Sequence, residues 1–134
     1  MFLSADKTYQ IGKNALDASS LRQQTIAHNV ANATTKNYKS KQVSFEESLK
    51  KALGETSSTG MRTTNSRHIG GSQSATSVRA EVYETASNTT MNLDGNNVDI
   101  DLEMANMAAN QIQYNALIQR TNGKLQSYSK VIKG

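Results

Sequence analysis

The stretch that decides the fold is residues 98–134, which read VDIDLEMANMAANQIQYNALIQRTNGKLQSYSKVIKG. Alternating steps of four and three residues from Ile100 reach ten positions, of which eight are apolar or aromatic. Such an alternation over more than four heptads is typical of a helix that packs along a seam, as in a coiled coil. We therefore predict one helix over this stretch, roughly 50 Å long.

Charged side chains mark both ends of this predicted helix. Asp99, Asp101 and Glu103 lie in its first turn, whereas lysines lie toward its carboxyl end. These charges oppose the helix macrodipole and stabilise both termini. Asp99 or Asn97 suits the N-cap, where a side-chain oxygen accepts hydrogen bonds from the first free amides of a helix.

A second apolar row runs along roughly the opposite side of the same helix, again at spacings of three and four residues. A helix that is apolar on two sides is normally buried between neighbours. We therefore expect this helix to contact more helices than its own chain supplies. The residues expected to face neighbouring subunits are Leu21, Leu102, Ala105, Ala109, Ile112 and Ala116.

The amino-terminal part of the chain, from about Ser4 to Asn32, holds no strong helix breaker and predicts a second long helix. Its apolar seam is weaker and more polar than the carboxyl-terminal one. Two helices at opposite ends of one chain, each needing a partner, suggest an antiparallel pair. The residues expected to pack between them are Leu16, Ile26, Val30, Ile100, Met104, Met107, Tyr114, Ile118 and Leu125.

The segment between the two helices is poorer in apolar residues. Residues 43–53 permit a short strand or a short amphipathic helix, of which we favour the helix, and residues 78–83 alternate as a strand does. In residues 54–77, 17 of 24 are Gly, Ser, Thr, Asn or Gln, so little apolar surface offsets the entropy of ordering. We predict a mainly α fold: an axial helix in 1–35, a weakly structured middle segment in 36–97 and an axial helix in 98–134.

Composition excludes several classes of protein and site. The chain has 134 residues, a net charge of +4 and no cysteine, so disulfides and thiolate metal sites are not available. We expect neither a signal peptide nor a membrane span, because the sequence shows no long apolar run. Residues 36–51 carry an excess of lysine that could meet phosphate, but no nucleic-acid-binding motif accompanies it. A solvated face is the simpler interpretation, and we expect no nucleic-acid partner.

No pattern of catalytic or metal-binding residues is apparent. His28 and His68 have no acid or nucleophile arranged around them in the sequence. Residues 94–105 resemble a calcium loop only superficially, because Asp99 stands where a glycine is needed and Ala105 where a bidentate glutamate is needed. We therefore expect a protein that is not an enzyme and that uses no cofactor or metal.

Two segments resemble the bacterial flagellar rod and hook proteins, a family of axial proteins. In residues 20–40, a helix ends in Asn-x-Ala-Asn and a turn leads to a tyrosine, although Lys36 and Asn37 stand where the family has Pro and Gly. Asn can still adopt the positive φ of that turn, and Tyr38 is placed to fold back on the helix end. Residues 94–117, DGNNVDIDLEMANMAANQIQYNAL, match the proximal-rod members more specifically. The matching positions are Asn29, Ala31, Asn32, Thr35, Tyr38, Asp94, Gly95, Asn96, Val98, Asp101, Glu103 and Met104.

The resemblance implies a structural subunit of the proximal rod in the flagellar basal body. Such a subunit is exported by the flagellar type III apparatus and assembles through its terminal helices into a hollow axial structure that transmits torque. Its expected partners are copies of itself, other rod proteins, the basal-body adaptor, and the membrane ring with its export gate. Two alternatives remain at this point: another type III-secreted coiled-coil subunit, and a basic coiled-coil adaptor.

Overall fold

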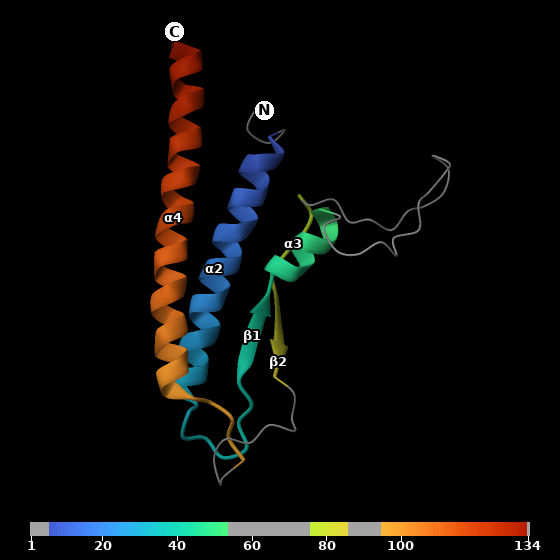
Figure 1. Cartoon of the computed structure of the whole chain (residues 1–134), viewed down its shortest axis with the longest axis vertical. Helices are drawn as coiled ribbons and strands as arrows, with labels where there is room; N and C mark the ends of the chain where they lie inside the picture. Colours follow the sequence, from blue (N-terminus) through green and yellow to red (C-terminus); the bar gives the residue numbers. More distant parts are fainter. Residues whose placement is uncertain (1–5, 54–75, 86–94, 134) are drawn as a thin grey trace, which may run out of the picture.

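The computed structural model describes residues 6–53, 76–85 and 95–133. Their elements, in chain order, are α2 (Lys7–Ala31), β1 (Lys41–Ser44), α3 (Glu46–Leu53), β2 (Glu81–Glu84) and α4 (Ile100–Lys133). The helices α2 and α4 run antiparallel, side by side, and α4 extends beyond the start of α2 (Figure 1). The predicted mainly α fold with paired terminal helices is confirmed. Residues 54–75 of the loop predicted over 54–77, Asp94 and Gly134 lie outside the described residues.

Aspartates begin both long helices. The Asp6 Oδ1 accepts hydrogen bonds from the amides of Thr8, at 2.8 Å, and Tyr9, at 3.4 Å, at the start of α2. At the start of α4, the Asp99 Oδ1 accepts from the Leu102 amide at 3.1 Å. Each carboxylate thus satisfies amides that have no partner within their helix, and of the two candidates Asp99 and Asn97, Asp99 is the N-cap of α4.

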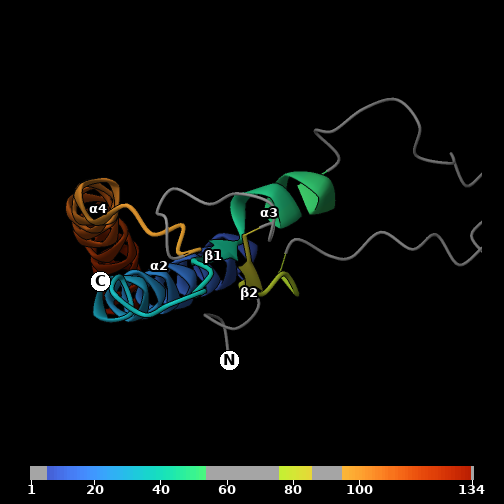
Figure 2. The same ribbon diagram turned by 90° about the horizontal axis from the view of Figure 1, so that it is seen from below.

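A small two-stranded sheet and α3 lie on the side of α2 away from α4 (Figure 2). Strands β1 and β2 pair antiparallel, with Val43 opposite Val82. Where we expected a helix over 43–53, the chain forms a strand first and begins α3 after Phe45. Phe45 packs with Ala18 of α2 and with Val78, and all three are buried. This apolar cluster fixes the sheet and α3 to α2.

The contact between α2 and α4 is largely polar. Asn110, 3 % exposed, donates through Nδ2 to the Ser19 carbonyl at 3.0 Å and to the Gln23 Oε1 at 2.9 Å. The Ser19 hydroxyl in turn donates to the Asn110 Oδ1 at 2.9 Å. Farther along, Gly12 lies against Thr121, because a Cβ built on Gly12 would meet the Thr121 Oγ1 at 3.6 Å. Hydrogen bonds and close approach of backbone therefore contribute to this contact in addition to the apolar side chains that we expected there.

Three residues of the predicted apolar seam are exposed instead of packed. Ile100 is 48 % exposed, Met104 51 % and Leu125 36 %. The residues of α4 that contact α2 come one position before the predicted seam positions in the sequence, and they include Glu103, Asn110 and Lys124. One residue turns the direction of a side chain by about 100° around a helix, so α4 presents a more polar face to α2 than the sequence suggested. The assignment of Ile100, Met104 and Leu125 to the contact between the helices is corrected accordingly.

Candidate assembly surface and the motif cluster

Asn29, near the end of α2, lies at the centre of a buried hydrogen-bond cluster and is 1 % exposed. Its Nδ2 donates to the Lys41 carbonyl at 2.8 Å and to the Glu103 Oε1 at 3.1 Å. Its Oδ1 accepts from the Lys41 amide at 2.9 Å and from the Tyr38 hydroxyl at 3.0 Å. These four bonds use the full capacity of the amide. One side chain therefore joins α2, β1 and α4.

Asn96 and Asn97 attach the segment that leads into α4 to the segment that leaves α2. Asn96 is fully buried, and its Nδ2 donates to three carbonyls that follow α2, those of residues 32, 33 and 35, at 2.9–3.0 Å. Its Oδ1 accepts from the Val98 amide at 2.7 Å. The Asn97 Oδ1 accepts from the Ser40 amide at 2.7 Å. Asn96 thus binds the carbonyls of the turn that follows α2, and Asn97 binds the backbone amide that precedes β1.

The two turns of this cluster both use left-handed backbone. Asn37 has a φ of 58° and Gly95 a φ of 82°. A Cβ on Gly95 would come within 2.5 Å of the Asn37 Oδ1, so only glycine fits this approach. The Lys39 ammonium donates to the Gly95 carbonyl at 2.9 Å. Asn37 adopts the positive φ that an asparagine can take, and the turn forms without the Pro and Gly of the family signature.

Tyr38 folds back on α2, as the sequence predicted. Its hydroxyl lies 2.8 Å from the His28 Nδ1 in addition to its bond with Asn29. Burial raises the pKa of Tyr38, and the carboxylates of Glu103 and Glu84 raise it further. The phenol therefore stays protonated and can keep donating to Asn29.

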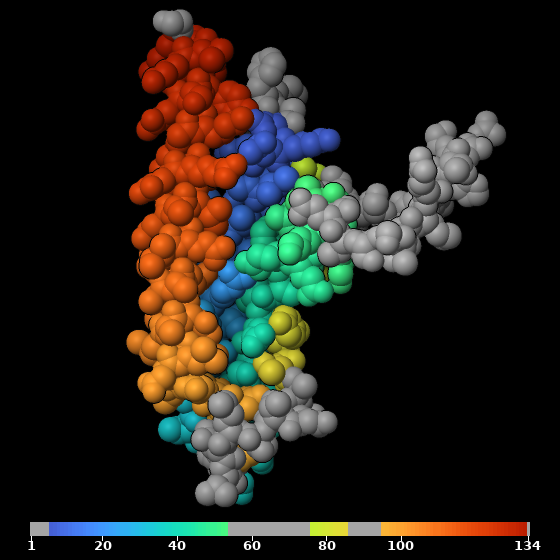
Figure 3. Space-filling model, viewed as in Figure 1, coloured from blue at the N-terminus to red at the C-terminus, as the bar shows by residue number. Residues whose placement is uncertain are grey.

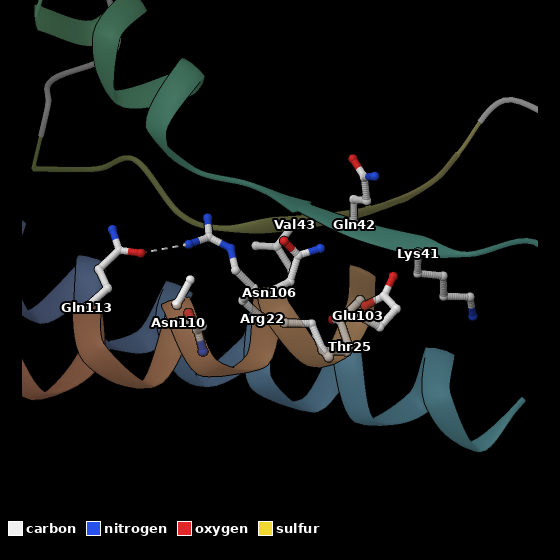
Figure 4. A pocket seen from close by; sticks show the side chains of 11 residues that line it. Arg22, Thr25, Lys41, Gln42, Val43, Glu103, Asn106, Asn110 and Gln113 are labelled. Atoms are coloured by element: carbon white, nitrogen blue, oxygen red, sulfur yellow. Dashed lines mark hydrogen bonds between the residues drawn. The ribbon is translucent and has the colours of Figure 1, made fainter. Parts of the chain in front are cut away.

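A groove of about 340 Å³ opens between α2, β1 and α4 (Figure 4). Arg22 and Gln113, joined by a hydrogen bond of 3.3 Å, lie at one end, and Glu103 lies toward the other. The Arg22 Nη2 also lies 2.7 Å from both carboxylate oxygens of Glu46 on α3. Burial raises the pKa of Glu46, but the hydrogen bonds from Arg22 outweigh it and leave this pKa lowered. Arg22 therefore forms a fixed wall of the groove.

At the other end of the helix pair, Asp6 holds α4 as well as capping α2. Its Oδ2 accepts a short hydrogen bond from the Tyr128 hydroxyl and pairs with the Lys124 ammonium at 3.0 Å. The Tyr128 bond and then Lys124 hold the pKa of Asp6 well below its usual range. The same contacts raise the pKa values of Lys124 and Tyr128.

Large apolar side chains remain exposed on α4. Leu102 is 56 % exposed and Ile112 72 %, and on the part of α4 that extends beyond α2, Val131 is 82 % exposed and Ile132 83 %. This helix forms one long edge of the molecule and is open to solvent along that edge (Figure 3). We call the outer residues Leu102, Ala105, Ala109, Ile112 and Ala116 the outer row; all five are exposed.

The predicted family-motif residues fall into two groups in space. Six of them take part in or border the cluster, namely Asn29, Asn32, Thr35, Tyr38, Asn96 and Glu103. Gly95 forms its turn and Val98 is buried beside it, whereas Ala31, Asp101 and Met104 are exposed.

Of the residues expected between the helices, Ile26 is buried, and those half-buried are Leu16, Val30, Met107, Tyr114 and Ile118. Leu21, expected at a subunit interface, is half-buried too.

Several residues that hold this arrangement were not singled out from the sequence. Asn110 joins α4 to Ser19 and Gln23, and the Asn14 Nδ2 donates to the carbonyls of residues 76 and 78 at 3.0 Å. One feature of the sequence could have indicated them: many asparagines lie within helical segments, where asparagine is unfavourable unless its side chain has a hydrogen-bond partner.

In the described ranges, no group of three or more His, Asp or Glu side chains is suited to a metal ion. No helix there is both long and apolar enough to cross a membrane.

Comparison with known proteins decides the family. No family model matches the chain. The chain is 38 % identical over 127 residues to the flagellar basal body rod protein FlgB of Bacillus subtilis, covering 95 % of this chain and 94 % of that protein. The chain belongs to the FlgB family of flagellar basal body rod proteins. It is also 30 % identical over 132 residues to FlgB of Escherichia coli, covering 96 % of this chain and 94 % of the relative.

Similarity to FlgB extends to a third bacterium and covers nearly the full chain. FlgB of Proteus mirabilis is 31 % identical over 132 residues, covering 96 % of this chain. The FlgB family is therefore matched along both long helices and the segment between them, and the resemblance seen in two segments of the sequence is confirmed over nearly the full chain.

Proposed function

We propose that this chain is a structural subunit of the proximal rod of the flagellar basal body. In this proposal it polymerises through α2 and α4 into a hollow axial structure that transmits torque. Membership of the FlgB family supports the place in the rod. The observation that carries the polymerisation is the exposed apolar side of α4, because large apolar side chains left in water by a folded chain mark an interaction surface.

The polar contact between α2 and α4 supports a role in which the pair is a rigid unit. The buried bonds of Asn29 and Asn110 fix the register of the two helices, since each amide fits only one set of partners. We propose that residues 1–35 and 98–134 supply the axial helices. The segment 36–97 then adds the small sheet and α3 on their outside.

The partners in this proposal are other copies of the chain, other flagellar rod proteins, the basal-body adaptor, and the membrane ring with its export gate. Leu21 and the outer row face these neighbours through heterologous contacts, which leave an open end on every assembly. The flagellar type III apparatus exports the chain to the basal body. The chain acts as a structural protein in flagellar motility and performs no catalysis.

Purification of basal bodies tests this proposal. Intact basal bodies are extracted with detergent from cells that express the chain, washed in high salt and analysed by mass spectrometry. The proposal predicts that the chain remains with the rod proteins after the wash. Its loss from otherwise intact rods would contradict a structural role in the rod.

A further inference from the structure

Glu103 is a buried carboxyl with few partners. It is 8 % exposed, and among the described residues its side chain accepts one hydrogen bond, from the Asn29 Nδ2 at 3.1 Å. A carboxylate can accept about four. Burying a carboxylate without a cation is costly, and a buried charge in a stable assembly is normally paired.

The cations near Glu103 are engaged elsewhere or remain apart from it. Arg22 lines the same groove, but its guanidinium binds Glu46 and Gln113. Lys41 lines the groove too. Among the described residues, the ion pairs join Arg22 to Glu46, Lys51 to Glu47 and Lys124 to Asp6, and Glu103 belongs to none of them.

The groove that contains Glu103 is open and connects to the outer side of α4. Its volume of about 340 Å³ is within the range of sites that take a ligand group, about 300–1,000 Å³. Asn106 and Ala109 form part of its wall, and both are exposed on α4. A side chain from another molecule can therefore reach the carboxyl along α4.

The opposite end of α4 carries the complementary charge. Beyond its contact with Asp6, α4 projects past α2 and places Lys130 and Lys133 in its last turn, beside the exposed Val131 and Ile132. These two lysines are exposed, and neither forms an ion pair among the described residues. The basic, apolar helix end lies at one end of α4, and the groove with the buried, unpaired carboxyl of Glu103 lies toward the other, as a head-to-tail contact requires.

We propose that the groove between α2, β1 and α4 receives the carboxyl-terminal turn of α4 from a second copy of this chain, with Lys130 or Lys133 of that copy pairing with Glu103. This inference rests on the proposed rod function. It adds a specific head-to-tail contact and gives the buried carboxylate its partner.

Cysteine cross-linking in basal bodies tests this contact, because the natural chain has no cysteine. The full chain carries Asn106→Cys in the groove wall together with Lys133→Cys, and a second version pairs Asn106→Cys with Lys130→Cys. Purified basal bodies are oxidised and run on a non-reducing gel. We expect a ladder of dimers and larger multiples from at least one version and none from Asn106→Cys alone. Their absence, with the chain retained in the rod, overturns the proposal.

A second variant tests the role of Glu103 within that contact. Glu103→Gln keeps the acceptor for Asn29 and removes the charge, so the proposal predicts about a tenfold loss of the ladder while the isolated chain stays folded. The matched control is Glu47→Gln, which removes an exposed carboxylate from α3 and should leave the ladder unchanged. A ladder that Glu103→Gln leaves unchanged overturns the pairing. Loss of the cysteine-free parent chain from basal bodies would instead refute the rod function, and this inference with it.

Discussion

The side-chain amide of Asn29 donates to the carboxyl of Glu103 across 3.1 Å, joining the end of α2 to the first turn of α4. Seventy-four positions separate the two residues in the sequence. Asn29 fills its remaining hydrogen-bonding capacity with Tyr38 and the backbone of Lys41. The contact therefore fixes the place where both long helices meet the connecting segments.

Substitution Glu103→Gln should stabilise the isolated chain at neutral pH. Burial raises the pKa of Glu103 above its ordinary value of 4.5, with a further increase from Asp99, although the Asn29 bond opposes this. The folded state therefore holds the proton more tightly than the unfolded state, and the natural chain loses stability as pH rises from 4.5 through the folded-state pKa. Glutamine accepts the same hydrogen bond without a charge.

Urea denaturation at pH 7 and pH 4 measures this effect. The variant should have the higher free energy of unfolding at pH 7, and the difference should shrink at pH 4, where the natural carboxyl is protonated. A variant less stable at pH 7 would mean that Glu103 already has a cation within its own chain, for which Lys41, which lines the same groove, is a candidate.

Substitution Asn29→Ala should destabilise the chain by about 2–4 kcal/mol, because it removes four buried hydrogen bonds and leaves their partners unsatisfied. Chemical denaturation monitored by circular dichroism measures the change. The matched control is Asn115→Ala on the exposed side of α4, where the asparagine accepts one hydrogen bond from Gln111. Equal effects of the two substitutions would contradict the central role of Asn29.

Two glycines of the chain should respond to alanine in opposite directions. Gly95→Ala should destabilise by about 1–2 kcal/mol, because φ is 82° and the new Cβ would press on the Asn37 side chain. Gly123→Ala should stabilise by about 0.5–1 kcal/mol, because Gly123 lies within α4 and no atom lies within 4 Å of the added Cβ. Thermal unfolding of both variants measures the two effects, and a stabilising Gly95→Ala would refute the close approach to Asn37.

Removal of the Asp6 carboxyl should loosen the far end of the helix pair. Asp6→Ala deletes the N-cap of α2 and the contacts with Tyr128 and Lys124, so amides in the last turns of α4 should exchange hydrogen faster. Asp17→Ala, an exposed carboxylate on α2, should leave their exchange unchanged.

The sign of the pH dependence at Asp6 follows from its lowered pKa. The folded state holds the charged form, so the contribution to stability is present above the ordinary pKa of 3.8 and is lost as pH falls through the lower folded-state pKa. The difference in exchange between Asp6→Ala and the natural chain should therefore be full at pH 5 and above. A difference that increased in acid would contradict this account.

The sequence predicted the two long helices and offered Asp99 as one of two caps, because these features depend on residues close together in the chain. The antiparallel pairing followed from the need of each helix for an apolar partner. The sequence did not predict which face of α4 meets α2. The apolar spacing that includes Ile100 and Met104 counts apolar side chains that pack within the chain together with those that remain exposed. In a subunit that assembles with others, some apolar residues pack within the chain and others face neighbouring subunits. Periodicity alone could not distinguish these two groups.

The motif cluster could be predicted only in part. The resemblance named Asn29, Asn96 and Glu103, but nothing in their spacing indicates that Asn96 reaches the carbonyls after α2 or that Asn29 reaches Glu103. Such contacts depend on where the connecting segments turn. Asn110 was missed because it lies beside the predicted seam of the carboxyl-terminal helix and not on it, whereas its partner Ser19 lies on the more polar seam expected for the amino-terminal helix.

The central claim, that the outer row of α4 is an assembly surface, is tested most directly by Ile112→Glu. Ile112 is 72 % exposed, so the variant should fold like the natural chain, yet it should be absent from purified basal bodies and fail to support swimming. Ala109→Glu should behave alike. Lys50→Gln on α3 changes the net charge equally and should assemble normally. Normal incorporation of Ile112→Glu and Ala109→Glu, with normal swimming, would contradict the account.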